Sequence, residues 1–196
     1  MQPRRIVLAT HNAHKVEELT RILGPALDGL ELVAYDGPEP VEDGATFQEN
    51  ALIKARAAAA HTGLPALADD SGICVDALDG APGIHSARYA GTRVDADNVA
   101  HLLEQLGDAS DRSAQFACAA AFVDGDDELV ELALWPGTVL SEPVGGGGFG
   151  YDPIFKPEGL SVSAAELRPD EKNAISHRAL AFGVLMPQVR ERLVTS

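Results

Sequence analysis

Cysteine is scarce in this sequence: the 196 residues include only Cys74 and Cys118. Both lie in apolar runs, and the pair lacks the C-x-x-C spacing of zinc and redox motifs. The pattern therefore indicates neither a disulfide framework nor a structural zinc site, and we expect two buried, unreactive thiols. Such cysteine use is typical of a reducing compartment, so we expect a cytoplasmic location.

Long apolar runs are also lacking. No stretch approaches the roughly 18 consecutive apolar residues that a transmembrane helix needs. The apolar run at residues 6–9 is too short for the hydrophobic region of a signal peptide. We therefore expect neither a membrane span nor a membrane partner.

Basic residues are outnumbered: 15 lysines and arginines face 30 aspartates and glutamates, which gives a net charge of −15. Such a surface repels phosphate backbones, so we do not expect duplex DNA or RNA as a partner. A smaller polyanion would need a local group of cations or a metal ion. Because 45% of the residues are hydrophobic, the chain can build a substantial core and is not disordered.

Apolar segments of strand length alternate with segments of helical periodicity. Residues 6–9 form the first expected strand, and after a polar turn Val16, Leu19 and Ile22 recur at helical spacing. The other expected strands are 30–35, 115–123, 129–135 and 138–144. The other expected helices start at the capping box of residues 46–49 and continue to 61, follow a cap at Asp95, and span 176–194 with a kink or restart at Pro187. This mixture predicts an α/β fold with a mixed sheet, in a single domain spanning 1–196 with one or two lobes.

The turn at residues 10–15 places polar side chains where a helix exposes its free N–H groups. Thr10 and Asn12 are short and polar, and Lys15 adds a cation one turn into the helix. This arrangement suits an anion, so the segment is a candidate phosphate cradle. Plain helix capping beside a surface lysine explains the same residues equally well.

The acidic pair Asp69-Asp70 lies between two apolar segments, where unneeded charge is costly. Adjacent side chains of a strand point to opposite faces, so the two carboxylates need not serve one site. One is suited to bind Mg²⁺ or to orient water, while the other braces the loop. An acidic turn beside Gly72 is the structural alternative.

Glu42 and Lys54 flank the start of a helix that the capping box of Thr46 and Glu49 predicts. Glu42 is a candidate second metal ligand, and Lys54 is placed to face a phosphate from the helix. Taken alone, an acidic surface loop explains Glu42 as well.

Four glycines at 145–148 lead directly into Phe149 and Tyr151. A P-loop is excluded because no Lys-Ser/Thr pair follows the glycines. A flexible linker is the usual meaning of four glycines, but a linker would not run into aromatic residues that must pack. The segment therefore favours close backbone approach to a flat ligand, with Phe149 as a stacking face.

Two cations and a histidine occur near the start of the last expected helix: Lys172, His177 and Arg178. Lysine and arginine donate hydrogen bonds and cannot accept them, so they suit a carbonyl oxygen on a base and disfavour an amino group there. A helix cap at Ser176 with solvated neighbours is the alternative.

Taken together, these segments resemble the Ham1-like inosine/xanthosine triphosphate pyrophosphatase family over nearly the whole chain. The motifs that carry the resemblance are, in order, T-H-N-A-H-K, E-D-G-A-T-F-Q-E-N-A, A-D-D-S-G-I, G-A-P-G-I-H-S-A-R-Y-A-G, G-F-G-Y-D-P-I-F and S-H-R-A. Each motif is weak alone, whereas the ordered set is highly specific. The chain departs from the family's pattern at His11, His14 and Ala179, where glycine is frequent in the family.

The resemblance implies hydrolysis of ITP, dITP and XTP between the α- and β-phosphates, giving the monophosphate and pyrophosphate. It also implies Mg²⁺, a homodimer, and an α/β fold with a long mixed central sheet, helices on both faces, and two lobes with an active-site cleft between them. By motif, Asp70 is the catalytic carboxylate and a metal ligand, with Asp69 and Glu42 as further metal ligands. The candidate substrate-binding residues, from the patterns and the resemblance together, are Thr10, His11, Asn12, Ala13, His14, Lys15, Lys54, Ser71, Phe149, Gly150, Tyr151, Asp152, Lys172, His177 and Arg178.

Two other functions fit parts of the pattern. A nucleotide-binding regulator would sense its ligand without cleaving it, although such a protein has little use for a base beside a metal. A pyrophosphatase similar to the Maf-like family would act on modified pyrimidines or methylated nucleotides with a shared architecture. Magnesium-dependent pyrophosphate release tests the first alternative, and a substrate panel tests the second.

Overall fold

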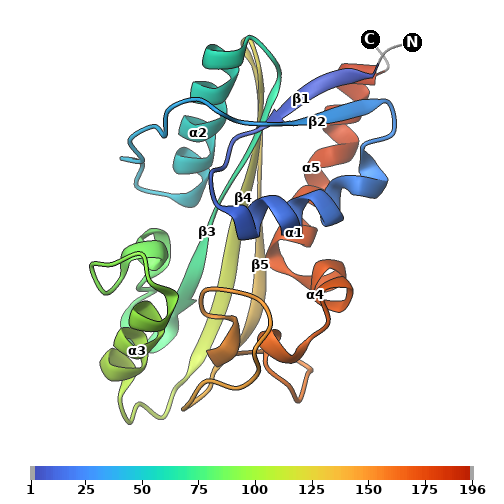
Figure 1. Cartoon of the computed structure of the whole chain (residues 1–196). Coiled ribbons are helices and arrows are strands. Elements are labelled where there is room, and N and C mark those ends of the chain that lie inside the picture. Colours follow the sequence, from blue (N-terminus) through green and yellow to red (C-terminus); the bar gives the residue numbers. More distant parts are fainter. Residues whose placement is uncertain (1–2, 195–196) are drawn as a thin grey trace. The chain divides into compact units, whose positions relative to one another are not determined.

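Residues 3–194, the part of the chain that the computed structural model describes, form an α/β fold around a mixed six-stranded sheet (Figure 1). The strand order is β2-β1-β3-β4-β5-β6. The strands are β1 (Arg4–Leu8), β2 (Leu30–Ala34), β3 (Ala66–Val75), β4 (Ser113–Asp124), β5 (Asp127–Val139) and β6 (Phe155–Pro157). β1 pairs in parallel with β2 and with β3, whereas β5 and β6 are antiparallel. The predicted mixed α/β fold is confirmed.

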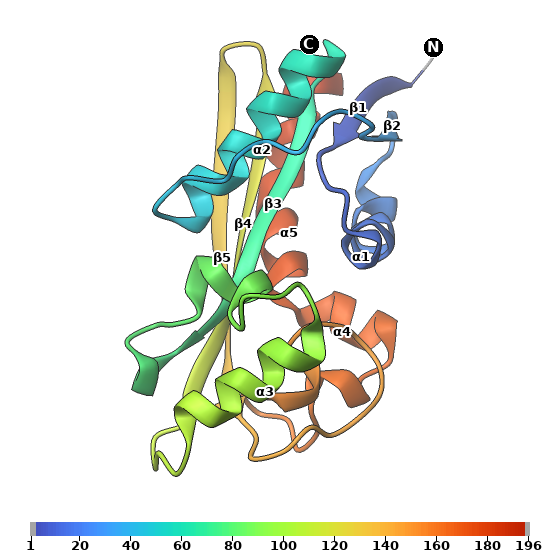
Figure 2. The ribbon, with the colours of Figure 1, turned by 60° about the vertical axis from the view of Figure 1, so that its left-hand side comes forward.

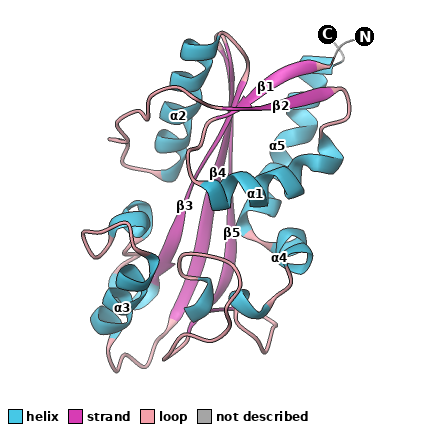
Figure 3. Cartoon of the chain, viewed as in Figure 1, coloured by secondary structure: helices cyan, strands magenta, loops and turns pink. Residues whose placement is uncertain are grey.

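The helices within the described residues are distinguished from the strands in Figure 3. The α-helices are α1 (Ala13–Leu23), α2 (Phe47–Thr62), α3 (Asp95–Leu106), α4 (Pro169–Ile175) and α5 (His177–Val194). The 3-10 helices are η1 (Gly24–Ala26), η2 (Asp76–Leu78), η3 (Gly83–Arg88), η4 (Asp152–Ile154) and η5 (Ala164–Glu166). Between residues 3 and 194, no helix combines the length and the apolar character that crossing a membrane requires.

Two compact units divide the chain. Unit 1 comprises Met1–Asp70, Cys118–Ala133 and Arg178–Ser196, and unit 2 comprises Ser71–Ala117 and Leu134–His177. The strands β3, β4 and β5 each contribute residues to both units.

Unit 1 places helices on both faces of its strands. α2 lies on one face, and α1 with α5 lies on the other (Figures 1 and 2). The alternation of side chains along β3 explains this arrangement, because Ala66 and Ala68 pack with the buried alanines of α2 while Leu67 packs with α1 and α5. The alanine-rich sequence of α2 thus reflects a helix that lies close to the sheet.

Unit 2 packs α3 and a group of aromatic rings into its own core. Leu102 of α3 lies with Ile73 of β3 in this core. The ring of Phe116 contacts those of Phe155 and Trp135, with centroid distances of 4.6 and 6.3 Å. These large rings hold the segments of unit 2 that carry the predicted nucleoside-binding residues.

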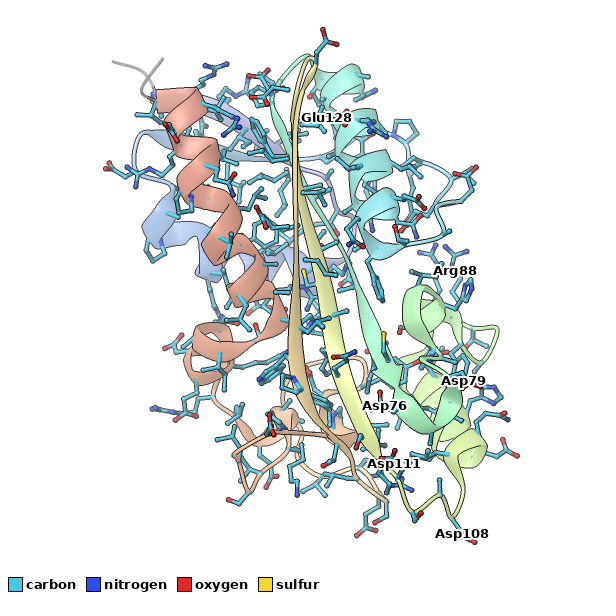
Figure 4. The ribbon with its side chains drawn as sticks, turned by 180° about the vertical axis from the view of Figure 1, so that it is seen from behind. Asp76, Asp79, Arg88, Asp108, Asp111 and Glu128 are labelled. Carbon is cyan, nitrogen blue, oxygen red and sulfur yellow. The ribbon has the colours of Figure 1, made fainter. Side chains whose placement is uncertain are left out.

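Several acidic residues lie exposed at turns and strand ends, as the side chains labelled in Figure 4 show. Asp108 and Asp111 occupy the turn between α3 and β4 in unit 2. Asp111 accepts a hydrogen bond from the Ser113 N–H at 2.9 Å, which lowers the pKa of its carboxyl. In unit 1, Glu128 at the start of β5 accepts two hydrogen bonds from Arg56 of α2, at 2.7 and 2.6 Å.

Several predicted elements differ from the structure. The strand expected at 138–144 is wrong, because β5 continues unbroken to Val139 through Pro136 and Gly137. Glycine is required there, since a Cβ at Gly137 would collide with the Lys156 carbonyl of β6. The short β6 and α4 were not predicted, and α5 continues as one helix through Pro187.

Candidate active site

The acidic pair Asp69 and Asp70 lies inside β3, as part of a ten-residue strand. The alternative of an acidic turn is therefore wrong. Because neighbouring side chains of a strand alternate, Asp69 shares the face of Leu67, toward α1 and α5, and Asp70 shares the face of Ala68, toward α2. The ion pairs of the two carboxylates agree with this assignment.

Asp69 is fully buried between two cations. Its Oδ2 atom accepts hydrogen bonds from Lys15 Nζ at 2.9 Å and from Arg178 Nε at 3.2 Å. Arg178 also donates from Nη1 to the buried Glu18 at 2.8 Å. Burial alone would raise the pKa of Asp69, but the charges of Lys15, Arg178 and Lys54 outweigh it and hold the pKa well below its usual range.

Asp70 has the opposite electrostatic balance. Its Oδ1 atom accepts a hydrogen bond from Lys54 Nζ at 2.9 Å, and the same ammonium donates to Glu42 Oε2 at 2.9 Å. Burial raises the pKa of Asp70, and the opposing charges of Lys54 and Lys15 do not fully offset it. The two adjacent carboxyls therefore differ in their electrostatics: the pKa of Asp69 is lowered and the pKa of Asp70 is raised.

Each carboxylate keeps one oxygen that suits a hard cation. Asp69 Oδ1 and Asp70 Oδ2 are buried, and neither has a hydrogen-bond partner within residues 3–194. Mg²⁺ prefers oxygen ligands and commonly takes one or two carboxylates together with substrate phosphates. No group of three or more His, Cys, Asp or Glu side chains placed to hold a metal occurs in the described part of the chain. Each of these oxygens therefore suits a metal ion whose other ligands are water or phosphate, not one held in a closed protein cage.

The polar turn before α1 combines capping with charge. Asn12 Oδ1 accepts hydrogen bonds from the backbone N–H groups of His14 at 3.0 Å and Lys15 at 3.3 Å. Thr10 Oγ1 accepts one from the Asn12 N–H at 3.2 Å. The capping interpretation is therefore confirmed for Asn12, but Lys15 is not a surface lysine, since it is paired with buried Asp69. Ala13 begins the helix.

His11 packs against Tyr35 next to this turn. The two ring centroids are 5.3 Å apart, and Tyr35 in turn contacts His61 of α2 at 5.8 Å. The Tyr35 hydroxyl donates to the Pro38 carbonyl at 2.9 Å, at the start of the loop that leads to Glu42. The side chain at position 11 is thus part of the packing of unit 1.

In unit 2, three of the predicted nucleoside-binding residues lie together. Asp152 Oδ2 accepts hydrogen bonds from the Phe149 N–H at 2.9 Å and from Lys172 Nζ at 2.6 Å. The Lys172 ammonium lies 5.0 Å from the centroid of the Phe149 ring, within the range of a cation–π contact. Gly148 has φ of +68°, and a Cβ there would collide with the Asp152 carboxylate. The glycine is therefore required by this arrangement.

The remaining predicted base-reading residues belong to different units. His177 is buried in unit 2, where its ring stacks on Phe116 at a centroid distance of 4.7 Å and an interplanar angle of 9°. Arg178 belongs to unit 1, where it holds Asp69 and Glu18. Ser71 follows Asp70 in β3 and is half-buried.

Residues 6–188 match the Ham1 family. The chain belongs to the Ham1 family. It is 58% identical over 191 residues to a dITP/XTP pyrophosphatase of Leifsonia xyli subsp. xyli, covering 95% of this chain and 96% of that protein. A dITP/XTP pyrophosphatase of Streptomyces coelicolor is 54% identical over 198 residues, covering 96% and 98%. The solved structure of a HAM1 protein from Coxiella burnetii superposes with a TM-score of 0.86 at 44% identity, covering 96% of this chain and 99% of that one.

This Ham1-family chain contains one buried charge that the sequence analysis did not single out. Glu18 is 8% exposed and holds Arg178, which in turn holds Asp69. The spacing of Lys15 and Glu18 was a usable signal, because residues three apart share a helix face. Asp95 and Ser86, in unit 2, were also missed; they hold the segment around Tyr151 through long-range hydrogen bonds that sequence spacing does not reveal.

Proposed function

We propose that this chain hydrolyses the non-standard purine nucleoside triphosphates ITP, dITP and XTP to the monophosphate and pyrophosphate. The dITP/XTP pyrophosphatases named above support this proposal, since they match nearly the whole chain. The structural observation that carries it is the pair Asp69 and Asp70: each is held by a lysine, and each has one buried oxygen that finds no hydrogen-bond partner among the described residues. This is a site for a metal ion and an anionic substrate in a chain whose overall charge repels anions.

Lys15, Lys54 and Arg178 would provide, together with Mg²⁺, the positive charge that a triphosphate requires, because four carboxylates already offset the three side-chain cations. A unit charge placed 4 Å from a phosphate contributes about 4 kcal/mol of direct attraction at an effective dielectric constant of about 20, before desolvation is subtracted. Interactions of this size are useful for a reaction in which negative charge develops on the leaving pyrophosphate. Lys15 and Lys54 are already fixed by Asp69 and Asp70, so little reorganisation is needed when the substrate binds.

Asp70 is the residue that orients the attacking water and accepts its proton. Its raised pKa makes it more basic than an ordinary aspartate, whereas the lowered pKa of Asp69 keeps that neighbour ionised. Asp69 and Asp70 would hold Mg²⁺ through their unpartnered oxygens, with Glu42 as a further candidate. When bound, Mg²⁺ would neutralise phosphate charge and favour departure of pyrophosphate.

The base is recognised through groups that donate hydrogen bonds. Lys172, His177 and Arg178 suit the 6-keto oxygen of hypoxanthine or xanthine, while the 6-amino group of adenine would leave a donor facing a donor. Phe149 offers its ring to the base, with Gly150, Tyr151 and Asp152 in the same segment. We also propose a cytoplasmic homodimer without nucleic-acid partners, in accord with the free cysteines and the net charge of −15.

Pyrophosphate release from ITP tests this function against that of a non-cleaving nucleotide sensor. With Mg²⁺ we expect equal amounts of IMP and pyrophosphate, and we expect EDTA to abolish both. Binding of ITP without release of pyrophosphate, at any Mg²⁺ concentration, would instead support the sensor.

A further inference from the structure

The segment that carries Phe149 and Asp152 is attached to the rest of unit 2 at two points between them. The Gly150 N–H donates to Asp95 Oδ2 at 2.7 Å. The Tyr151 hydroxyl donates to the Ser86 carbonyl at 2.8 Å. Gly148 and Gly150 both have positive φ, and these two bonds add to the hydrogen bonds within the segment by tying it to α3 and η3.

Asp95, which accepts the hydrogen bond from the Gly150 N–H, lies at the start of α3. The helix is capped at Val94 without any side-chain hydrogen bond, and Asp95 is its first residue. A carboxylate in the first turn of a helix is favoured by the helix dipole, and a hydrogen bond to a charged acceptor is stronger than one between neutral groups. Asp95 therefore links the N-terminus of α3 to a backbone amide 55 residues away.

The second attachment point is rigid. Tyr151 and Ser86 are each only 5% exposed. The Ser86 hydroxyl accepts from the Ile73 N–H at 3.0 Å and donates to the Gly83 carbonyl at 2.6 Å, which fixes η3 against β3.

η3 and α3 are themselves joined. Buried Asn98 of α3 accepts from the Ala90 N–H at 2.8 Å and donates to the carbonyls of Ala87 and Thr92, both at 3.3 Å. Asp95 and Ser86 therefore lie on two helices, α3 and η3, that are hydrogen-bonded to each other and together hold the segment of Gly150 and Tyr151.

We propose that Asp95 is a positioning residue for base recognition: by holding the Gly150 amide, it fixes where the Phe149 ring and the Asp152–Lys172 pair lie. This inference rests on the proposed function, because it assigns to Asp95 a part in binding the purine of that substrate. Asp95 is not a catalytic residue, since it acts through the backbone of its neighbour. Its loss should weaken nucleotide binding and leave the chemical step largely intact.

The test compares Asp95→Ala, Asp95→Asn and the matched control Asp97→Ala in the full-length chain. Asp97 lies in the same helical turn but contacts the Thr92 hydroxyl, at 2.9 Å, so its removal takes the same charge from the same helix end. We expect Asp95→Ala to raise KM for ITP about tenfold, since a charge-assisted hydrogen bond is lost, with kcat within about threefold of the native value. Asparagine still accepts a hydrogen bond, so Asp95→Asn should recover most of this loss. Asp97→Ala should match the native protein.

If Asp95→Ala fails to fold, Tyr151→Phe provides a second test. It removes the hydrogen bond to the Ser86 carbonyl and keeps the ring, and it should also raise KM for ITP. Equilibrium binding of IMP to the same proteins provides a readout independent of turnover. An unchanged KM and IMP affinity in Asp95→Ala, a loss confined to kcat, or an Asp95→Asn variant as weak as Asp95→Ala would each overturn the inference. Native protein that binds IMP but releases no pyrophosphate from ITP would overturn the proposed function alone; loss of IMP binding in Asp95→Ala would still support the positioning role.

Discussion

Asp69 and Asp70 are neighbours in β3, yet their surroundings shift their pKa values in opposite directions. The cause is the alternation of the strand, which turns one carboxylate toward Lys15 and Arg178 and the other toward Lys54. Asp69 is buried and paired with both Lys15 and Arg178, whereas Asp70 shares Lys54 with Glu42. The two residues therefore differ in what they contribute to folding and to chemistry.

Asp70→Asn should remove turnover and leave the fold intact. We expect kcat to fall by about 10²–10⁴, the usual contribution of a positioned general base. The free energy of unfolding should be unchanged or slightly raised, because the ionised carboxylate is partly uncompensated and Lys54 keeps Glu42 as a partner. Steady-state pyrophosphate release and urea unfolding measure the two effects. A variant with near-normal kcat would remove Asp70 from its role.

Asp69→Asn should mainly destabilise the fold. The substitution leaves the buried Arg178 and the half-buried Lys15 without their shared anion, and breaking a buried ion pair costs about 3–5 kcal/mol. Urea unfolding, with Asp70→Asn as the matched neighbour, measures this difference. Equal stability of the two variants would contradict the assignment of Asp69 as the structural anion.

The pH dependence of these two variants should also have opposite signs. Folding lowers the pKa of Asp69, so its stabilising effect is present above the ordinary aspartate pKa of about 3.9 and is lost as the pH falls further. Folding raises the pKa of Asp70, so its ionisation costs stability as the pH rises above that range. Urea unfolding between about pH 3 and pH 7 measures this. Relative to the native protein, the free energy of unfolding of Asp69→Asn should fall further as the pH rises, whereas that of Asp70→Asn should rise or stay unchanged. Stability curves parallel to that of the native protein would contradict both assignments.

At the level of elements, the start of α2 holds the loop that carries Glu42. Thr46 and Glu49 form a capping box, and Glu49 Oε2 also accepts from the Ala45 N–H at 2.6 Å. Buried Asn50 accepts from the Gly44 N–H at 2.9 Å. The sequence alone predicted this helix start, because the capping residues lie within four positions of one another.

Thr46→Ala should cost about 1 kcal/mol of stability, since it removes the acceptor for the Glu49 N–H. Thr20→Ala is a suitable control, because Thr20 is exposed and only donates back to the Val16 carbonyl within α1. That control should lie within about 0.5 kcal/mol of the native protein. Equal effects of the two variants on the urea midpoint would argue against a structural role for the capping box.

The sequence did not predict elements that lack a cap, a turn motif or an apolar periodicity of their own. α4 has seven residues and no apolar periodicity, and β6 has only three residues, which pair with β5 at a point where Gly137 allows a close approach. The same limit applies to the site. The resemblance selected Lys15, Asp69 and Arg178, but these residues are separated by 54 and 109 positions, and nothing in the sequence indicates that one carboxylate oxygen holds both cations.

At the scale of the whole molecule, we propose that residues 1–196 unfold as a single two-lobed domain. Three strands of one sheet, β3, β4 and β5, each contribute residues to both units, so neither unit can lose its strands independently. Differential scanning calorimetry should therefore give one transition, with calorimetric and van't Hoff enthalpies in agreement. Two resolved transitions would show that the units are separate domains.

The most direct test of the central claim is a substrate panel assayed for pyrophosphate with Mg²⁺: ITP, dITP, XTP, ATP, GTP and modified pyrimidine triphosphates. If the protein reads the 6-keto oxygen of its purine, kcat/KM for ITP, dITP and XTP should exceed that for ATP by at least about 10²-fold, because adenine leaves a buried donor unpaired. Equal kcat/KM for ITP and ATP, or a preference for modified pyrimidines, would contradict this account.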